Sequence, residues 1–187
     1  MPSFFLAMIA AALASFGGRD QRLVAHLSGT LGATLPLLAV AWLAVVATSA
    51  LAAIAGAALA TTMPAAAKHM LVAFALVLGA VELLWQRPLR EAEEPTRSAF
   101  AILIVLGALQ LGDGARFLVL AVAVATGDPV LAALGGAVGS GAVLTAGWAM
   151  GPGLGNGLPL RAIRYTAAAL MAGAGLIIGL SARGLLG

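Results

Sequence analysis

Residues 110–117 read QLGDGARF, and they interrupt an apolar run, 99–125, that otherwise has the length and composition of a membrane-spanning helix. Gln110, Asp113 and Arg116 stand near the middle of this run. A charged side chain at the centre of a bilayer costs roughly 2.5–3.5 kcal/mol on the insertion scale, so such residues are paired, hydrated or functional. The fold and the function both depend on why this helix carries them.

The composition around this stretch is that of an integral membrane protein. Of the 187 residues, 62% are hydrophobic and only 9% are charged, with a mean hydropathy of +1.08. The absence of Cys excludes disulfides and Cys-based metal or haem sites. The formal charge is only +3, and no basic run has interleaved aromatic residues, which argues against a nucleic-acid partner. The lipid bilayer is therefore the expected partner.

Six stretches are long and apolar enough to span a membrane, if the polar interruptions in two of them are allowed. The predicted spans are 3–28, 31–60, 64–85, 97–125, 129–150 and 159–182. Pro64, Pro129 and Pro159 stand where helices would begin, and Asp128 is a predicted N-cap. We therefore predict an all-α integral membrane protein with six transmembrane helices.

An aqueous linker divides the chain into two halves. We expect a first three-helix unit at 1–87, a linker at 88–96 and a second three-helix unit at 97–187. With six spans, the linker and the loop before the last span share one side, and five arginines flank them: Arg87, Arg90, Arg97, Arg161 and Arg164. The positive-inside rule then predicts a cytoplasmic linker and two outside termini, in a bacterial inner membrane.

The two halves are related by an internal repeat at an offset of 95 residues. This offset pairs Gly17 with Gly112, Gly32 with Gly127, Gly56 with Gly151, and Pro64 with Pro159. Because each half has three spans, an odd number, the halves insert with opposite orientation. The pattern predicts two inverted three-helix repeats, with a site near the midplane where they meet.

The same offset aligns SFGGRDQR, residues 15–22, with QLGDGARF. Over nearly its whole length the chain resembles the UPF0016 family, which includes Golgi and bacterial manganese or calcium transporters. The family motif is Glu-x-Gly-Asp-Lys-Thr/Ser in the first helix of each repeat. Residues 118–151 and 158–180 also resemble the second repeat and the last helix of the family.

The resemblance implies a divalent cation/proton exchanger in which carboxylates from both repeats form an oxygen-rich site. Manganese or calcium would be the substrate, and no cofactor is expected. Ser15 and Gln110 stand at the two Glu positions, Asp113 keeps the Asp position, and Asp20 lies two positions beyond its counterpart. These four residues are the candidate ion-binding residues between the first and fourth helices, and Asp113 is the candidate metal ligand.

Basic residues in the two motifs leave a second interpretation open. Arg19, Arg22 and Arg116 outnumber Asp20 and Asp113. An Arg would then fill the ancestral cation site through pairs such as Arg19 with Asp113 or Asp20 with Arg116, leaving a transport-inactive scaffold or accessory subunit of a membrane complex. A net positive site also suits an anion. Four glycines could break the two helices and free backbone groups for an ion: Gly17, Gly18, Gly112 and Gly114.

Other features of the sequence carry less functional information. No Ser–His–Asp set or His cluster indicates catalysis, so we do not expect an enzyme. Glu82 is expected near the head groups or beside Arg87, and the alternative is that it reaches the ion site. The stretch GGAVGSG, residues 135–141, has small residues four apart, which allows close approach of a helix from the same chain or from a second copy. A homo-oligomer or larger membrane complex therefore stays open.

Overall fold

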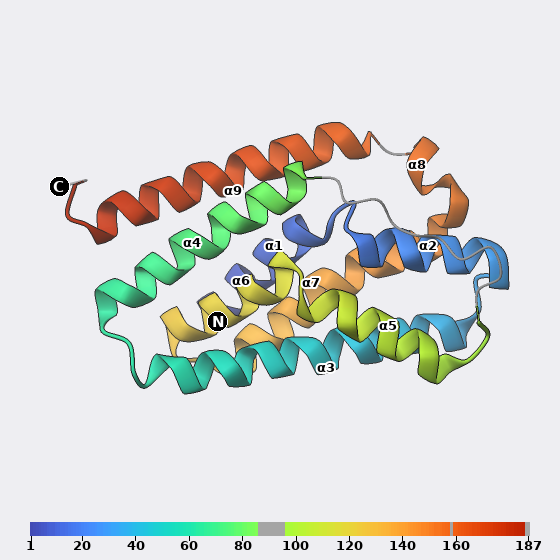
Figure 1. Ribbon diagram of the computed structural model, residues 1–187, viewed down its shortest axis with the longest axis horizontal. Coiled ribbons are helices and arrows are strands. Elements are labelled where there is room, and N and C mark those ends of the chain that lie inside the picture. Colours follow the sequence, from blue (N-terminus) through green and yellow to red (C-terminus); the bar gives the residue numbers. More distant parts are fainter. Residues whose placement is uncertain (86–95, 158, 186–187) are drawn as a thin grey trace.

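The computed structural model describes residues 1–85, 96–157 and 159–185, and every regular element in them is a helix (Figure 1). This confirms the predicted all-α fold. The elements are α1 (Pro2–Ser15), α2 (Arg19–Leu31), α3 (Leu35–Ala60), α4 (Ala65–Leu84), α5 (Ala99–Leu111), α6 (Gly114–Thr126), α7 (Pro129–Met150), the 3-10 turn η1 (Gly151–Gly153), α8 (Leu154–Gly157) and α9 (Leu160–Ala182).

Four helices are long and apolar enough to cross a membrane, namely α3, α4, α7 and α9. Two further spans are reached when the bent pairs α1–α2 and α5–α6 are each counted as one, with bends of 65° and 61°. The described residues therefore contain four to six candidate spans, and the chain has the character of a membrane protein. Residues 88–95 of the predicted linker lie outside the described part of the chain, together with Arg87.

The two bent pairs are interrupted by glycine-containing segments. Between α1 and α2, Gly17 has a φ of +67°, a conformation that glycine adopts at little cost. Between α5 and α6, Gly112 ends one helix and Asp113 is the N-cap of the next. The polar stretches quoted above thus lie at breaks inside the two bent pairs, and not along continuous helices.

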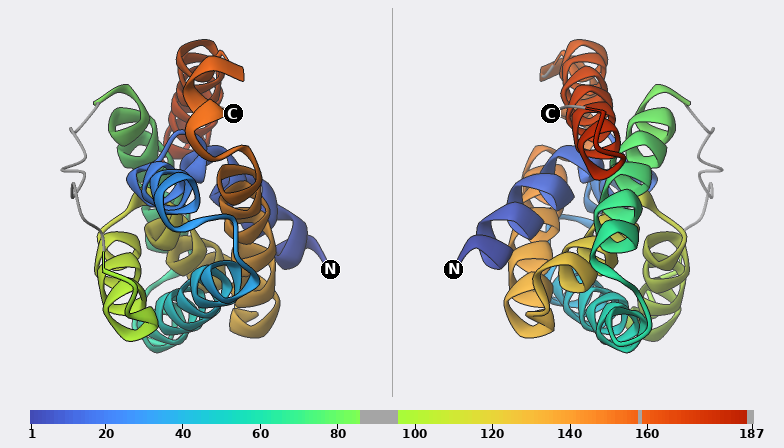
Figure 2. Two further views of the ribbon diagram at one scale, coloured as in Figure 1. Left: turned by 90° about the vertical axis from the view of Figure 1, so that its right-hand side faces the viewer. Right: turned by 90° about the vertical axis from the view of Figure 1, so that its left-hand side faces the viewer.

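Helix α7 lies in the middle layer of the bundle. In Figures 1 and 2, α4 and α9 lie together along one edge, α3 and α5 lie along the opposite edge, and α1, α2, α6 and α7 lie between them. Helix α7 packs against α1, α2, α3 and α6. Its N-terminus is capped as predicted, because the Asp128 carboxylate accepts a hydrogen bond of 3.2 Å from the backbone N–H of Leu131.

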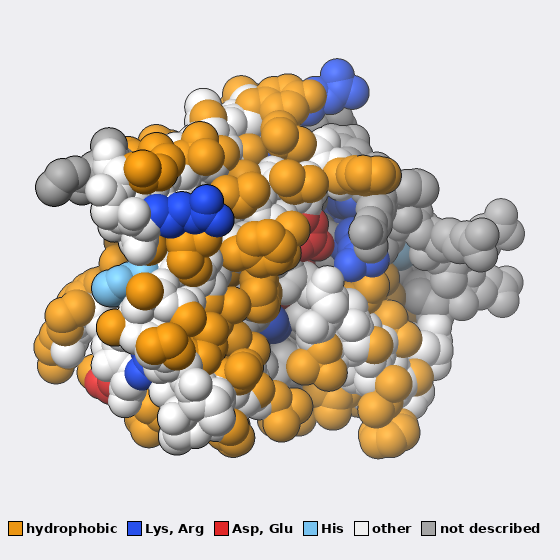
Figure 3. Space-filling view, turned by 60° about the vertical axis from the view of Figure 1, so that its left-hand side comes forward, with side chains coloured by type: hydrophobic (Ala, Val, Ile, Leu, Met, Phe, Trp, Pro, Cys, Tyr) orange, Lys and Arg blue, Asp and Glu red, His pale blue; other side chains and the backbone are white. Residues whose placement is uncertain are grey.

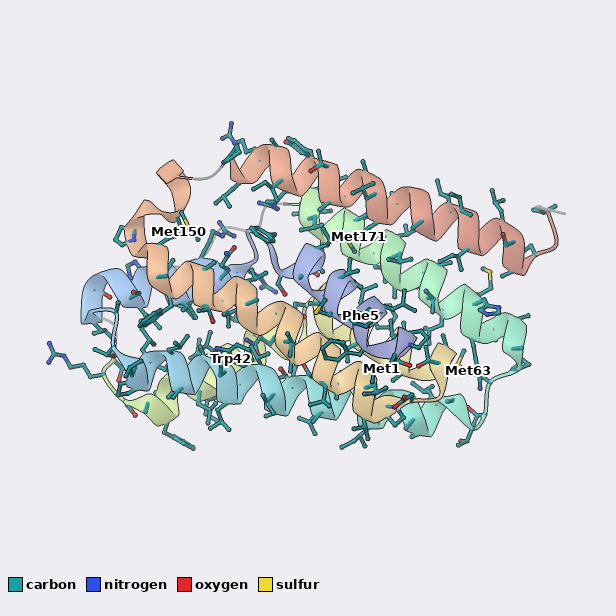
Figure 4. All side chains as sticks on the ribbon, turned by 180° about the vertical axis from the view of Figure 1, so that it is seen from behind. Met1, Phe5, Trp42, Met63, Met150 and Met171 are labelled. Carbon is teal, nitrogen blue, oxygen red and sulfur yellow. The ribbon has the colours of Figure 1, made fainter. Side chains whose placement is uncertain are left out.

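Glycines on α7 allow this close packing. A Cβ atom at Gly135 or Gly139 would lie within 2.2 Å of a backbone oxygen of α1, and one at Gly136 would meet Val119 of α6. On the side that faces α3, Trp42 covers Gly141 and donates from its ring nitrogen to Thr145 (Figure 4). Lipid gives no hydrophobic drive for helix association, so such close contacts supply much of the packing energy.

Helices α4 and α9 form a separate antiparallel pair. Gly79 of α4 lies beneath Met171 of α9, and Gly175 of α9 lies beside the backbone of Ala73 (Figure 4). Many large apolar side chains are exposed on the bundle, and Figure 3 shows basic and acidic side chains at only a few places on one face. A largely apolar exterior is the arrangement expected for helices that face lipid.

The contact between α1 and α7 gives a stability prediction. Gly139→Ala would place a methyl group about 2.2 Å from the Met8 carbonyl oxygen, so the helices must separate. We expect a loss of roughly 1–3 kcal/mol, seen as a lower thermal unfolding temperature in detergent. Gly107→Ala in α5 is the matched control, because no atom lies within 4 Å of its added Cβ. Equal unfolding temperatures for the two variants would contradict the packing described.

Candidate functional site

The two helix breaks line one polar cavity of about 40 Å³, which has room for a small ion or a few water molecules. Its wall comes from the α1–α2 break, the end of α4, the α5–α6 break and the start of α9. The polar side chains that line it are Ser15, Arg19, Asp20, Arg22, Glu82, Asp113 and Arg164. The breaks therefore bring residues from four parts of the chain to a common site.

At the first break, side chains satisfy backbone groups that a continuous helix would have paired. The Gly17 N–H donates to Gln21 Oε1 at 2.7 Å, and the Gln21 N–H donates to Asp20 Oδ1 at 2.8 Å. The Gln21 amide also donates to the backbone oxygen of Val143 on α7 at 3.0 Å. Asp20 is only 4% exposed, so this carboxylate is held by N–H donors inside the protein.

At the second break, two carboxylates lie at the N-terminus of α6. Asp113 Oδ1 accepts from the Arg116 N–H at 2.9 Å, and Glu82 Oε2 of α4 accepts from the Gly114 N–H at 2.5 Å. The N-terminal end of a helix carries a partial positive charge and unpaired N–H groups, both of which favour carboxylates. Glu82 thus fixes the end of α4 against the start of α6.

A buried hydrogen-bond network joins the two breaks through α3 and α7. Arg116 Nη1 donates to Ser140 Oγ at 2.9 Å, and Ser15 Oγ donates to the same oxygen at 2.9 Å. Arg116 Nε donates to Thr48 Oγ1 at 2.8 Å. The network therefore ties α1 and α6 to hydroxyl groups of the two long helices.

The same network continues to the opposite break. Thr48 Oγ1 lies 3.0 Å from Gln110 Oε1, and Gln110 Nε2 donates to Asp20 Oδ2 at 3.5 Å. Gln110 has no exposed surface, and Arg116 is 2% exposed. Six helices, α1, α2, α3, α5, α6 and α7, thus contribute to one buried polar network.

Arginines outnumber the carboxylates around the cavity. Arg164 of α9 lies over Gly17, where a Cβ atom would come within 2.7 Å of Arg164 Cδ, and its Nη2 donates to the Leu83 carbonyl. Arg116 attracts both Asp20 and Asp113 electrostatically. With Arg19 and Arg22, four guanidinium groups face the three carboxylates, so the region keeps a formal positive charge.

The structure brings all four candidate ion-binding residues into this region. Ser15, Asp20 and Gln110 belong to the buried network, and Asp113 lines the cavity and caps α6. The side-chain nitrogens of Arg116 donate to hydroxyls instead of pairing directly with Asp20. Among the described residues no three His, Asp or Glu side chains converge closely enough to hold a metal ion.

Several residues of the site were not singled out from the sequence. Thr48 and Ser140 are isolated hydroxyls in apolar helices, and such residues commonly bond to their own backbone. For Glu82 the sequence favours the head-group region, with the site as the alternative, and Arg164 is counted among the charges of the loop before the last span. Only the three-dimensional arrangement shows that α4 ends, and α9 begins, beside the two breaks.

Comparisons of the chain with protein-family models, with curated proteins and with solved structures gave no match.

The network gives a test with neighbouring residues. Thr48→Val removes the hydroxyl that accepts from Arg116 Nε, leaving a buried guanidinium N–H without an acceptor. We expect a loss of about 1–3 kcal/mol of stability. Ser49→Ala is the matched control, because the described residues offer no hydrogen-bond partner to the buried Ser49 Oγ. Thermal unfolding in detergent measures both, and a Thr48→Val protein as stable as Ser49→Ala would refute the role assigned to Thr48.

Proposed function

We propose that this chain is a membrane transporter of a small ion, with its substrate site at the two helix breaks. The observation that carries the proposal is the meeting of both breaks at one polar cavity inside an otherwise apolar helical bundle. Discontinuous helices that present polar groups near the midplane are typical of the substrate sites of secondary transporters. Continuous helices would suffice for a protein that only spans the membrane.

We further propose six spans arranged as two inverted repeats, with helices α1–α2 and α5–α6 as the first span of each. Adding the repeat offset of 95 to the first and last residue numbers of α2 (Arg19–Leu31) gives those of α6 (Gly114–Thr126). The same offset also carries the first residue of α4, Ala65, onto the first residue of α9, Leu160. In Figure 1, α4 runs opposite to α9 and α3 runs opposite to α7, which supports opposite insertion of the two halves.

Side-chain contacts support the same symmetry. Gln21 of α2 donates to residue 143 of α7, and Arg116 of α6 donates to residue 48 of α3. The offset of 95 residues pairs position 21 (Gln21) with position 116 (Arg116), and position 48 (Thr48) with position 143 (Val143). Both contacts therefore join the second half of a broken helix to the long helix of the other repeat.

The proposed substrate is a divalent cation, manganese or calcium, exchanged for protons, as the resemblance to the UPF0016 family implies. Three carboxylates line the cavity, Asp20, Asp113 and Glu82. Their oxygens accept hydrogen bonds from N–H groups in this conformation, so an entering cation has to displace those donors. The proposed setting is the bacterial inner membrane, with the linker in the cytoplasm and both termini outside.

A transport-inactive scaffold is the second candidate function. The observation that favours it is Arg116, whose guanidinium lies in the network between the breaks and ties them to α3 and α7. A fixed cation at that place repels a substrate cation and stabilises one conformation. Purification with a stoichiometric partner protein, together with the absence of ion flux, would support this function over transport.

The transport proposal predicts flux that depends on Asp113. Purified protein in proteoliposomes is expected to take up manganese or calcium under an imposed pH gradient, and Asp113→Asn is expected to reduce the uptake rate at least tenfold. Asn is also a good N-cap, so the substitution removes the charge and keeps the helix start. The measurement is uptake of the radioactive ion against time.

The matched control is Asp128→Asn. Asp128 caps α7 in the same manner as Asp113 caps α6, but it lies outside the cavity. We expect this variant to keep its uptake rate. Loss of uptake in both variants would assign the effect to helix capping, and no uptake by the folded wild-type protein for either ion would overturn the proposed function.

A further inference from the structure

A second hollow lies on the outer face of the bundle, between α3 and α6 beside the end of α5. It has a volume of about 340 Å³ and is separate from the cavity at the breaks. Its apolar lining consists of Leu51, Ala52, Ala55, Leu111, Phe117 and Leu120. Leu51 and Leu111 are each more than half exposed, so the groove opens sideways along α3, a candidate membrane span.

Arg116 is the charged residue that lines this groove. Its Nε and Nη1 donate to Thr48 and Ser140, whereas Nη2 is buried and finds no hydrogen-bond partner among the described residues. A buried guanidinium N–H without an acceptor is costly, and more so at membrane depth. Arg116 therefore lines an apolar groove and has one guanidinium donor without a partner among the described residues, and a ligand in the groove reaches this buried donor only if neighbouring side chains move aside.

We propose that this groove binds an amphiphilic anion from the bilayer, a long-chain carboxylate of the fatty-acid class. The carboxylate accepts a hydrogen bond from Arg116 Nη2, and the hydrocarbon chain lies along the apolar wall formed by α3 and α6. The positive charge of Arg116 and the apolar side chains that make up the rest of the groove lining together favour this ligand. A small hydrophilic anion fits less well, because it gains nothing from the apolar wall and must leave water to enter.

This binding goes beyond the proposed transport function and does not depend on it. Because Arg116 also holds Thr48 and Ser140, a carboxylate at Nη2 adds a negative charge to the network that joins the two breaks. The ligand is therefore expected to stabilise the conformation described here, since any ligand that binds only the folded form raises the unfolding temperature.

Fluorescence of cis-parinaric acid, a conjugated fatty acid, tests the proposal with the full chain in detergent. We expect saturable binding that oleate displaces and that oleyl alcohol displaces at least about tenfold less well, because the alcohol lacks the charge that strengthens the hydrogen bond to Arg116. Equal displacement by the alcohol would overturn the carboxylate assignment.

Two substitutions test the place of binding. Ala55→Trp fills the groove from an exposed position of α3 and leaves the Arg116 side chain in the protein, and it is expected to weaken binding at least about tenfold. Ala47→Trp, also exposed on α3 but outside the groove lining, is the matched control and should bind as the wild type does.

Arg116→Gln, if the variant folds, is expected to remove the preference for oleate over oleyl alcohol. Unchanged affinity in a folded Ala55→Trp protein would overturn the proposal, whatever the result for Arg116→Gln. Because binding is measured without ion flux, its failure is distinguishable from a failure of the transport function.

Discussion

Every backbone N–H and C=O group inside a membrane needs a partner within the protein, because lipid offers none. The two helix breaks are the places where this requirement is hardest to meet. Gln21 accepts from the Gly17 N–H at one break, and Asp113 and Glu82 accept from the first N–H groups of α6 at the other. In this conformation, the polar residues of both motifs accept hydrogen bonds from backbone N–H groups. An ion that binds there would have to compete with these hydrogen bonds.

Arg116 extends this requirement from the breaks to the whole bundle. A guanidinium group inside the bundle needs acceptors on several sides, and α3 and α7 supply Thr48 and Ser140. The helices must approach closely for such short side chains to reach it. The glycines of α7 permit that approach, because Gly136 accommodates Val119 of α6 and Gly139 accommodates the backbone of α1. The close packing of the helices and the hydrogen bonds of the buried Arg116 guanidinium therefore depend on each other.

Much of the fold follows from the sequence because hydrophobic length alone indicates spans, and the glycines and prolines that mark their ends are local signals. The positions of Gln110, Asp113 and Asp20 in one polar region also follow from the repeat. The partners Thr48 and Ser140 do not, because a hydroxyl in an apolar helix gives no sign of which face it occupies. From sequence alone, the glycines of the two motifs fit either a helix break or close room at a helix crossing. The positive φ of Gly17, the Asp113 cap of α6 and the bends between the paired helices show that both spans are broken there.

Under the proposed inverted-repeat plan, positions 21 and 116 correspond to each other, and the difference between their side chains has a physical consequence. Gln21 is neutral and is satisfied by one backbone carbonyl and one N–H, whereas Arg116 requires hydroxyl acceptors and keeps one donor open. Under the proposed inverted-repeat plan, the two halves exchange their arrangements during the conformational change. Gln21 would then occupy the environment that Arg116 has here, and Arg116 would occupy that of Gln21. Val143, at the position related to Thr48, has no side-chain acceptor to offer a guanidinium group. Under this proposed plan, the conformation described here is favoured over the one in which the two halves have exchanged their arrangements, and the proposed anion at Arg116 Nη2 would increase that preference.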